Sequence, residues 1–252
     1  MTKHINYNKI VFFLTTLLLF ISCKNPSDCF ESTGKIIQKE VSLDFFNTIE
    51  VGNEVSLILK QGNTQKVVIE TGENLLDNVT VEVIDNKLYM KDESSCNLTR
   101  DYAITKVFVT SPNIRAIRSN TARIIKSNSV LNYPNLKLIS EDFNQDALNI
   151  GDFDLDINTQ TLDIIANGNS VFNIKGNTVQ LNIGFHSGSS RFNGEVLNAN
   201  TVHIIQKSTN DILVKPLNNI NGDIYSIGDV ICYYHPNSVN VAEHYSGKLI
   251  FR

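Results

Sequence analysis

The chain has 252 residues, with 22 Lys and Arg against 26 Asp and Glu and a formal net charge of −4 at pH 7. A protein that binds nucleic acid needs clustered Lys and Arg to neutralise phosphates, and this mildly acidic composition argues against such a partner. No run rich in Pro, Gly, Ser or charge divides the sequence, so its length predicts one large domain or two small ones.

Residues 1–22 have the pattern of a secretory signal peptide. Lys3 and Lys9 precede an apolar stretch, residues 10–21, that only Thr15 and Thr16 interrupt. This stretch is too short to cross a bilayer, which takes about 20 residues, and its length and basic start are typical of a signal peptide. Removal of residues 1–22 takes away two basic and no acidic residues, which leaves a net charge of −6.

The leader ends in Phe20-Ile21-Ser22-Cys23, where a small residue precedes a cysteine as in a bacterial lipobox, with Phe20 in the place where Leu is usual. We expect lipidation of Cys23, which would make the protein an outer membrane lipoprotein with residues 23–34 as anchor and short linker. The alternative is ordinary cleavage near Ser22, with Cys23 an incidental thiol. The sequence leaves open whether the protein faces the periplasm or the cell exterior.

Three further cysteines remain for an oxidising compartment, where disulfides persist. Cys29 and Cys96 lie in polar, loop-like sequence and are expected to pair, whereas Cys232 lies in the apolar run DVICYYH and is expected to be buried and reduced. A bridge between Cys29 and Cys96 closes a loop of roughly 70 residues and stabilises the fold by roughly 4 kcal/mol. Free thiols throughout are the alternative, because connectivity cannot be deduced from sequence alone.

From Lys35 onward the sequence is a succession of short β-branched runs broken by Gly, Asn and Asp, with no helical apolar period of useful length. The runs EVSLILKQG, KVVIETG, VTVEVIDNKLYMK and TKVFVTS have the composition and alternation of strands. The predicted fold class is therefore all-β.

The second half contains an approximate internal repeat with equal steps along the sequence. The copies LDIIANGNSVFNIKG, NIGFHSGSSRFNG and VHIIQKSTNDILVKP begin at Leu162, Asn182 and Val202, and they align Phe172, Phe192 and Ile212. Each copy is a strand, a polar bend and a second strand, too small to bury a face alone, so the stacking of copies creates the core. The repeat predicts a β-solenoid of short strands whose coils are spaced by about 4.8 Å, and it becomes less regular toward the middle of the chain.

Asparagine makes up 32 of the 252 residues, and many of these residues fall at the predicted bends of the repeat. The bend positions are Asn167, Asn169, Asn177, Asn193, Asn198, Asn200 and Asn210. Asn tolerates a left-handed backbone better than most residues, so we expect these positions to form coil corners. The functional alternative is a polar face that binds glycan.

Asp152, Asp154 and Asp156 alternate in GDFDLDI and are predicted to point to one side of a strand. They are a candidate cation or ligand face, because carboxylate oxygens are ligands of calcium. The alternative is the solvated face of a strand whose other face holds Phe153, Leu155 and Ile157.

Other candidates for chemistry are sparse. Four histidines are dispersed, without the close spacing of a zinc motif: His186, His203, His235 and His244. The run GFHSGSSRF lacks the strand, elbow and helix that a hydrolase nucleophile requires, and we expect a bend there. A candidate sugar-stacking face, for which ordinary strand packing is the alternative, consists of Arg191, Tyr225, Tyr233, Tyr234 and Tyr245.

The run FFNTIEVGNEVSLILKQGNTQKVVIETGENLLDNVTVEVIDNKLYMK, followed by YAITKVFVTSPNIRAIRSNTA, SGSS and NGDIYSIGDV, resembles the putative auto-transporter adhesin head GIN domain. This is a domain of unknown function that occurs in envelope lipoproteins of the Bacteroidetes. The resemblance covers about residues 35–252. It implies a right-handed β-helix-like fold for that range and a place at the cell envelope.

We therefore expect a lipid-anchored protein of the cell envelope with a non-catalytic binding, adhesion or structural role. The sequence predicts no catalytic residue, metal site or cofactor. The expected partners are the membrane, through the N-terminal lipid, and a glycan or another envelope protein. The alternative is a carbohydrate-active enzyme, similar to a polysaccharide lyase, on a β-helix.

Overall fold

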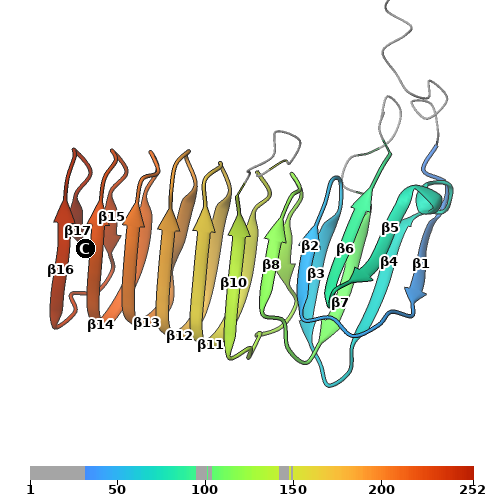
Figure 1. Ribbon diagram of the computed structural model, residues 1–252, viewed down its shortest axis with the longest axis horizontal. Coiled ribbons are helices and arrows are strands. Elements are labelled where there is room, and N and C mark those ends of the chain that lie inside the picture. The colour runs from blue at the N-terminus through green and yellow to red at the C-terminus, as the bar shows by residue number, and fades with distance from the viewer. Residues whose placement is uncertain (1–31, 95–100, 102–103, 142–147, 149) are drawn as a thin grey trace, which may run out of the picture.

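The computed structural model describes residues 32–94, 101, 104–141, 148 and 150–252. The fold is all-β, as predicted, with about 61% of the described chain in strands and 3% in helix. Figure 1 shows a strongly curled sheet that is elongated in one direction. The predicted lipidation site Cys23 and the predicted Cys29–Cys96 disulfide lie outside the described residues. Within the described ranges, no helix has both the length and the apolar character that crossing a membrane requires.

The sheet contains 17 strands, and a single 3-10 helix interrupts their succession in the described chain. The elements in chain order are β1 (Ile36–Val41), β2 (Thr48–Val51), β3 (Ser56–Gln61), β4 (Lys66–Gly72), η2 (Glu73–Asn78), β5 (Val79–Ile84), β6 (Lys87–Asp92), β7 (Lys106–Ser111), β8 (Ala116–Ser119), β9 (Ile125–Ser127), β10 (Asn135–Ser140), β11 (Phe153–Ala166), β12 (Val171–Phe185), β13 (Arg191–Gln206), β14 (Ile212–Ile224), β15 (Val230–Cys232), β16 (Ser238–Glu243) and β17 (Leu249–Phe251).

The curled sheet has two rows of strands, because the two halves of a long strand pair with different neighbours. In β11, Phe153 and Asp154 pair with β9, whereas residues 161–166 pair with β10. The A row consists of β6, β2, β8 and β10, the second halves of β11 to β14, and β16. The B row consists of β7, β3 and β9, the first halves of β11 to β14, and then β15 and β17. Buried apolar side chains from both rows form the core.

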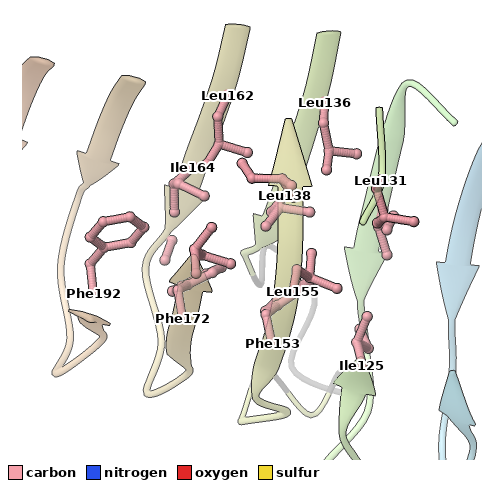
Figure 2. Packing of buried hydrophobic residues seen from close by; sticks show 14 of the residues in the cluster. Ile125, Leu131, Leu136, Leu138, Phe153, Leu155, Leu162, Ile164, Phe172 and Phe192 are labelled. Carbon is pink, nitrogen blue, oxygen red and sulfur yellow. The ribbon is translucent and has the colours of Figure 1, made fainter. Parts of the chain in front are cut away.

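Inward side chains of successive parallel strands form apolar columns. Phe153 pairs with Phe172, which pairs with Phe192, and Phe192 pairs in turn with Ile212. All four are fully buried, and the rings of Phe153 and Phe172 stack with centroids 4.8 Å apart and an interplanar angle of 9°. Figure 2 shows this packing. The predicted register of Phe172, Phe192 and Ile212 is confirmed.

The predicted alignment of the middle copy at Asn182 is wrong by one position. Leu162 pairs with Leu181, and Leu181 pairs with Val202, so the equivalent position in the middle copy lies just before Asn182 and the two steps are unequal. β11 and β12 pair without a register shift, whereas an extra residue in β13 lengthens the next step: Asn173 of β12 pairs with residue 193, but Gly176 pairs with residue 197. Apolar residues pair on both sides of this bulge, Phe172 with Phe192 before it and Leu181 with Val202 after it.

Strands of the first half are not stacked in chain order (Figure 1). β2 pairs in parallel with both β6 and β8, and β3 pairs in parallel with both β7 and β9. The coil of β2 and β3 therefore lies between two coils that follow it in the sequence. Beyond it, β4 runs antiparallel to β7 and to β1, and β5 runs antiparallel to β6. The continuous solenoid predicted for residues 35–252 is not confirmed, and this order accounts for the irregular repeat before residue 150.

Three glycines of the second half adopt a positive φ, Gly188 in a turn and Gly176 and Gly222 within strands. Gly176, Gly188 and Gly222 have φ values of 110°, 77° and 133°. A Cβ at Gly222 would lie 1.9 Å from the carbonyl oxygen of Ile204 in the neighbouring coil, so a larger residue does not fit there.

The prediction that asparagine adopts a left-handed backbone at the coil corners is wrong. All seven predicted positions are described, and none has a positive φ. Three of the seven lie in bends (Asn167, Asn169 and Asn210) and four lie within strands (Asn177, Asn193, Asn198 and Asn200). Their side chains can bond across neighbouring strands instead, as Asn193 Nδ2 does to Asn173 Oδ1 at 2.7 Å. Repetition of Asn at one register position lets each amide satisfy the next.

Aspartates at the start of B-row strands join successive coils. Asp152 Oδ1 accepts the backbone N–H of Val171 at 3.0 Å, and Asp211 Oδ1 accepts that of Asp229 at 3.0 Å. Asp229 Oδ1 in turn accepts the N–H of Lys248 at 2.8 Å. Each of these bonds satisfies a backbone donor at a corner, where the regular ladder of the sheet begins.

Cys232 is a free thiol in β15 and is fully buried, as predicted. Burial disfavours the thiolate and raises the pKa of Cys232 to about 12. The side chain therefore acts as a small apolar residue of the core and is protected from reaction with solvent.

Substitution of the central ring of the phenylalanine column tests how far the stacking of coils supports the fold. Phe172→Ala should lower the free energy of unfolding by about 3–5 kcal/mol, because it removes a buried ring and leaves a cavity. Urea denaturation measures the effect. The control is Val196→Ala, at a side chain that is 63% exposed, which should change stability by less than about 0.5 kcal/mol. Equal free energies of unfolding for the two variants would show that the phenylalanine column does not stabilise the core.

Removal of one aspartate from the corner tests the bonds between coils. Asp152→Ala should cost about 1 kcal/mol of stability because the Val171 N–H loses its acceptor. Asp154→Ala, at an exposed position of the same strand, should cost less than about 0.5 kcal/mol. Thermal unfolding of both variants at one pH gives the comparison, and a larger loss for Asp154→Ala than for Asp152→Ala would refute the assignment.

Candidate binding face of the A row

The outward side of the A row carries a column of polar side chains, which we call the amide column. Its members occupy one register position in successive strands: Asp163, Asn182, His203, Asn221 and Asn240. The flanking residues Leu162 and Ile164 are buried. Because side chains alternate between the faces of a strand, the column lies on the outer face.

Hydrogen bonds connect members of the amide column between strands. Asn182 Nδ2 donates to Asp163 Oδ1 at 2.7 Å. His203 Nδ1 lies 2.5 Å from Asn221 Oδ1, and the ring nitrogen carries the proton because the amide oxygen only accepts. These bonds restrict the rotamers of the side chains, so the column is ordered before any ligand arrives.

Further amides widen the column along the strands. Gln180 Nε2 donates to Asn182 Oδ1 at 3.1 Å, and Asn221 Nδ2 donates to Asn219 Oδ1 at 3.1 Å. Neighbouring strands are spaced by about 4.8 Å, so donors and acceptors recur at that interval. The face therefore offers hydrogen-bonding groups in a regular, two-dimensional arrangement.

A second series of side chains follows the corner at which the A-row strands end, and we call it the corner ladder. Each member donates its backbone N–H to the carbonyl of the last strand residue in the preceding coil: His186, Lys207, Tyr225 and His244. All four residues are exposed. Equivalent backbone bonds thus place the four side chains above one another along the stack.

Ring stacking and a cation stabilise the corner ladder. The rings of Tyr225 and His244 are 4.4 Å apart at an angle of 6°. Lys207 Nζ lies 5.2 Å from the centroid of the Tyr225 ring, a distance at which a cation and an aromatic ring attract each other. Tyr225 therefore has Lys207 on the coil before it and His244 on the coil after it.

The corner ladder borders the same face as the amide column. His244 Nε2 lies 2.7 Å from Oδ1 of Asp223. Asp223 pairs with Ala242 and is two positions from Asn221, so it shares the outer face of the A row. His186 also reaches back over this face, because a Cβ on Gly184 would lie 3.0 Å from His186 Nε2.

The three predicted aspartates lie in the B row. Asp154 is exposed, Asp152 and Asp156 are half-buried, and the apolar residues between them are fully buried, so the predicted alternation is confirmed. Asp152 accepts a backbone N–H, and Asp156 Oδ2 lies 3.7 Å from Lys175 Nζ. In the described part of the chain, no three His, Cys, Asp or Glu side chains are grouped so that they could hold a metal ion. Cation binding by the aspartates stays a prediction.

The sugar-stacking face considered from the sequence stays a prediction, and one of its members, Tyr233, is half-buried. Tyr225 belongs to the corner ladder, and Tyr234 and Tyr245 are exposed close to the C-terminus. The guanidinium of Arg191 donates instead to the side-chain oxygens of Asn193 at 2.8 Å and of residue 210 at 3.0 Å. Its contacts thus join the start of β13 to the bend before β14.

The run GFHSGSSRF forms the predicted bend between coils. Ser187 Oγ donates to the carbonyl oxygen of Asn167 at 3.0 Å, and Ser189 Oγ donates to Asn169 Oδ1 at 2.7 Å. The serines thus bond to the preceding bend, which is a structural role.

Sequence reasoning missed the amide column and the corner ladder. The signal for both is spacing, since members of the corner ladder recur at nearly constant steps along the sequence. The alignment of Asn182 with Leu162 concealed the pair of Asp163 and Asn182, because β12 pairs with β11 one position earlier than equal steps predict.

Comparison with known proteins gives a family for this chain. The family model described as "Putative auto-transporter adhesin, head GIN domain" matches residues 45–236. Among curated proteins, none matches the sequence closely enough to count as a relative.

Solved structures share the fold at low sequence identity. A putative adhesin from Bacteroides fragilis has a TM-score of 0.77 and 18% identity, over 88% of this chain and 100% of that one. A putative lipid binding protein from Parabacteroides distasonis has a TM-score of 0.62 and 13% identity, over 87% of this chain and 99% of that one. A putative adhesin from Parabacteroides merdae has a TM-score of 0.56 and 14% identity, over 87% of this chain and 98% of that one. The chain thus belongs to the family of the putative auto-transporter adhesin head GIN domain, as the resemblance in its sequence predicted.

Proposed function

We propose that this protein is a non-catalytic binding protein of the cell envelope that holds an extended, neutral glycan against the outer face of the A row. The observation that carries the proposal is that the amide column and the corner ladder border one face. Sugar hydroxyls both donate and accept hydrogen bonds, and Asn amides with Asp carboxylates offer both functions. The family description as an adhesin agrees with a binding role.

The repetition of the face favours an extended ligand. Asn182, His203, Asn221 and Asn240 recur once per strand, so a chain laid across the strands meets a similar group at each step. Stacked coils of a repeat protein form long surfaces of this kind. Because Asp163 takes part in this pattern and the whole chain has a net charge of −4, a neutral glycan is favoured over an acidic one, which the carboxylates would repel.

Anchorage by a lipid on Cys23 fits the arrangement of the two ends. β1 lies toward one end of the long axis, and β16 and β17 lie at the other (Figure 1). A lipid at Cys23, with residues 23–34 as linker, attaches the protein on the β1 side and directs the C-terminal coils away from the membrane. The predicted bridge between Cys29 and Cys96 would close the chain on the anchored side.

In this proposal the coils of residues 150–252 wind as a right-handed β-helix. Successive parallel pairing of β11, β12, β13 and β14 supports it. Crossover connections between parallel strands of one sheet are right-handed in most proteins, because strand twist favours that hand. The winding keeps the outer face of the A row continuous over these coils.

A pair of double variants with the same chemistry tests the binding face. Asn182→Ala with Asn221→Ala should weaken binding to neutral polysaccharides at least about tenfold. The control is Asn177→Ala with Asn198→Ala, which removes a hydrogen-bonded amide pair from the B row and should leave binding unchanged. Binding is measured on an array of neutral and acidic polysaccharides.

Two results would contradict the proposal. One is that the B-row variant loses binding while the A-row variant retains it. The other is the release of reducing or unsaturated ends from a bound polysaccharide by the wild-type protein, which would establish an enzyme. Neither outcome depends on the lipid, so the array uses protein that carries Cys23→Ser.

The anchor has its own test. Cys23→Ala should move the protein from the membrane fraction to the soluble fraction, because the sequence offers no other acylated residue at the end of the leader. Fractionation with an immunoblot measures the distribution, and Ser27→Ala serves as a control that should remain with the membrane. Retention of Cys23→Ala in the membrane fraction would show that attachment has another cause.

A further inference from the structure

An apolar strip follows the outer face of the A row, two residues beyond the amide column. Each member pairs with the next on neighbouring strands, and we call the set the isoleucine strip: Ile139, Ile165, Gly184 and Ile205. These positions alternate with buried residues, so they face outward as the amide column does. The isoleucine side chains are half-buried, which leaves apolar surface in contact with water. A ligand that covers this surface gains free energy from its burial.

Polar side chains border the isoleucine strip on both long sides. In β13, His203 of the amide column lies two residues before Ile205, and Lys207 of the corner ladder lies two residues after it. Two residues of a strand span about 6.6 Å. A ligand that is centred on the strip therefore meets hydrogen-bonding groups along both of its edges.

Charged side chains close the isoleucine strip at both ends. Ile139 pairs with Arg118 of β8, and Ile205 pairs with Asp223 of β14. The carboxylate of Asp223 in turn lies 2.7 Å from His244 Nε2. Between these ends the strip crosses four strands, which is about 14 Å from the first strand to the last. The strip is therefore long enough for a few units of an extended chain.

Gly184 leaves a gap in the strip, and the ring of His186 lies over it. A Cβ on Gly184 would lie 3.0 Å from Nε2 and 3.3 Å from Cε1 of His186. Gly184 pairs with Ile165 on one side and with Ile205 on the other. The imidazole thus continues the strip between two isoleucines and brings a ring nitrogen, which can donate or accept a hydrogen bond, over the face.

We propose that the isoleucine strip, with the ring of His186 over Gly184, is the floor of the glycan site and selects sugars whose hydroxyls are all equatorial, as in β-linked glucose chains. The inference rests on the proposed function and narrows it to this class of neutral glycan. Such a sugar has C–H groups on both faces and hydroxyls around its rim. Its face covers the isoleucines, while its rim reaches the amide column on one side and the corner ladder on the other.

The polar borders favour a sugar over a lipid chain on the strip. An acyl chain has no hydrogen-bonding group, so it would shield nearby polar groups such as Asn182 and His203 from water without replacing the lost hydrogen bonds. Leaving polar groups unpaired in this way is unfavourable. A sugar replaces those bonds with its own hydroxyls, which both donate and accept.

An axial hydroxyl distinguishes chains of the same linkage. In an extended β-linked chain such as that of cellulose, successive sugars are turned over, so an axial hydroxyl would point toward the strip on every second sugar. The isoleucines offer it no hydrogen bond, and the removal of an unpaired hydroxyl from water is unfavourable. A glucose chain should therefore bind more tightly than a mannose chain of the same linkage, in which one hydroxyl of each sugar is axial.

Isothermal titration calorimetry with two hexasaccharides tests the inference on the mature chain from residue 23 that carries Cys23→Ser. Cellohexaose should bind at least about tenfold more tightly than mannohexaose of the same linkage. Equal affinities, tighter binding of mannohexaose, or binding of neither while another neutral polysaccharide binds would overturn the inference and leave the proposed function in place. A protein that binds no neutral glycan at all would overturn both.

A double variant tests the strip itself. Ile165→Thr with Ile205→Thr removes apolar surface and keeps the β-branched shape that suits a strand. It should weaken cellohexaose binding at least about tenfold and reduce the preference over mannohexaose. The matched control is Val68→Thr with Val171→Thr, at two half-buried valines outside the A row, which should bind as the wild type does. Equal affinities of the two double variants would overturn the inference.

Gly184→Ala tests the part of His186 without removing a polar group. The φ of Gly184 is not positive, and apart from His186 the nearest atom to an added Cβ is the carbonyl oxygen of Ile164, at an ordinary contact distance of 3.8 Å. The variant should therefore fold, displace the imidazole and weaken cellohexaose binding at least about tenfold. Unchanged affinity would remove His186 from the proposed floor.

Discussion

The inward side chains of each coil must match those of the coils on both sides, and the rest of the structure depends on this constraint. A single copy of the repeat has too little apolar surface to fold alone. The column that contains Phe153, Phe172 and Phe192 meets the requirement with stacked aromatic rings. Once the inward positions are aligned, the outward positions are aligned as well, because the two sets alternate along the same strands. The amide column is therefore a geometrical consequence of the core.

Aligned outward positions restrict which side chains are tolerated. A like charge repeated at one position on neighbouring strands would repel itself, whereas a neutral amide both donates and accepts. The high content of asparagine follows from this property, as the bond between Asn193 and Asn173 illustrates. The same repetition orders the polar groups of the A row before a ligand arrives. A structural requirement and a candidate binding surface thus have one origin.

The all-β class and the repeat near Phe172 could be predicted because their signals are local or have a constant period. The position of β2 and β3 between later strands could not, since strand composition does not identify a distant partner. The alignment of Asn182 with Leu162 fails because the coils differ in length: Leu162 pairs with Leu181, and a bulge in β13 then lengthens the next step. Asn and Gly are both turn formers, but at position 222, within β14, the close approach of the Ile204 carbonyl selects glycine, and only the three-dimensional structure shows this approach.

The candidate site is harder to predict than the fold because its members are ordinary residues in isolation. The members of the corner ladder can be recognised as one group only in the folded protein, where equivalent backbone hydrogen bonds stack them. The aspartates at 152–156 are easily noticed as a candidate site because they are close in sequence. They lie in the B row, however, and the carboxylate of Asp152 already accepts a backbone N–H. In a stacked fold, a candidate site is formed by residues that lie one coil apart in the sequence.

Side-chain amide resonances of the protein, followed by NMR while a neutral polysaccharide is added, test the central claim most directly. The claim is that the outer face of the A row is the binding surface. It predicts that the signals of Asn182, Asn221 and Asn240 shift with the polysaccharide concentration and that those of Asn177 and Asn198 stay in place. Shifts confined to Asn177 and Asn198, or the absence of shifts from all five for every neutral polysaccharide that the protein binds, would contradict it.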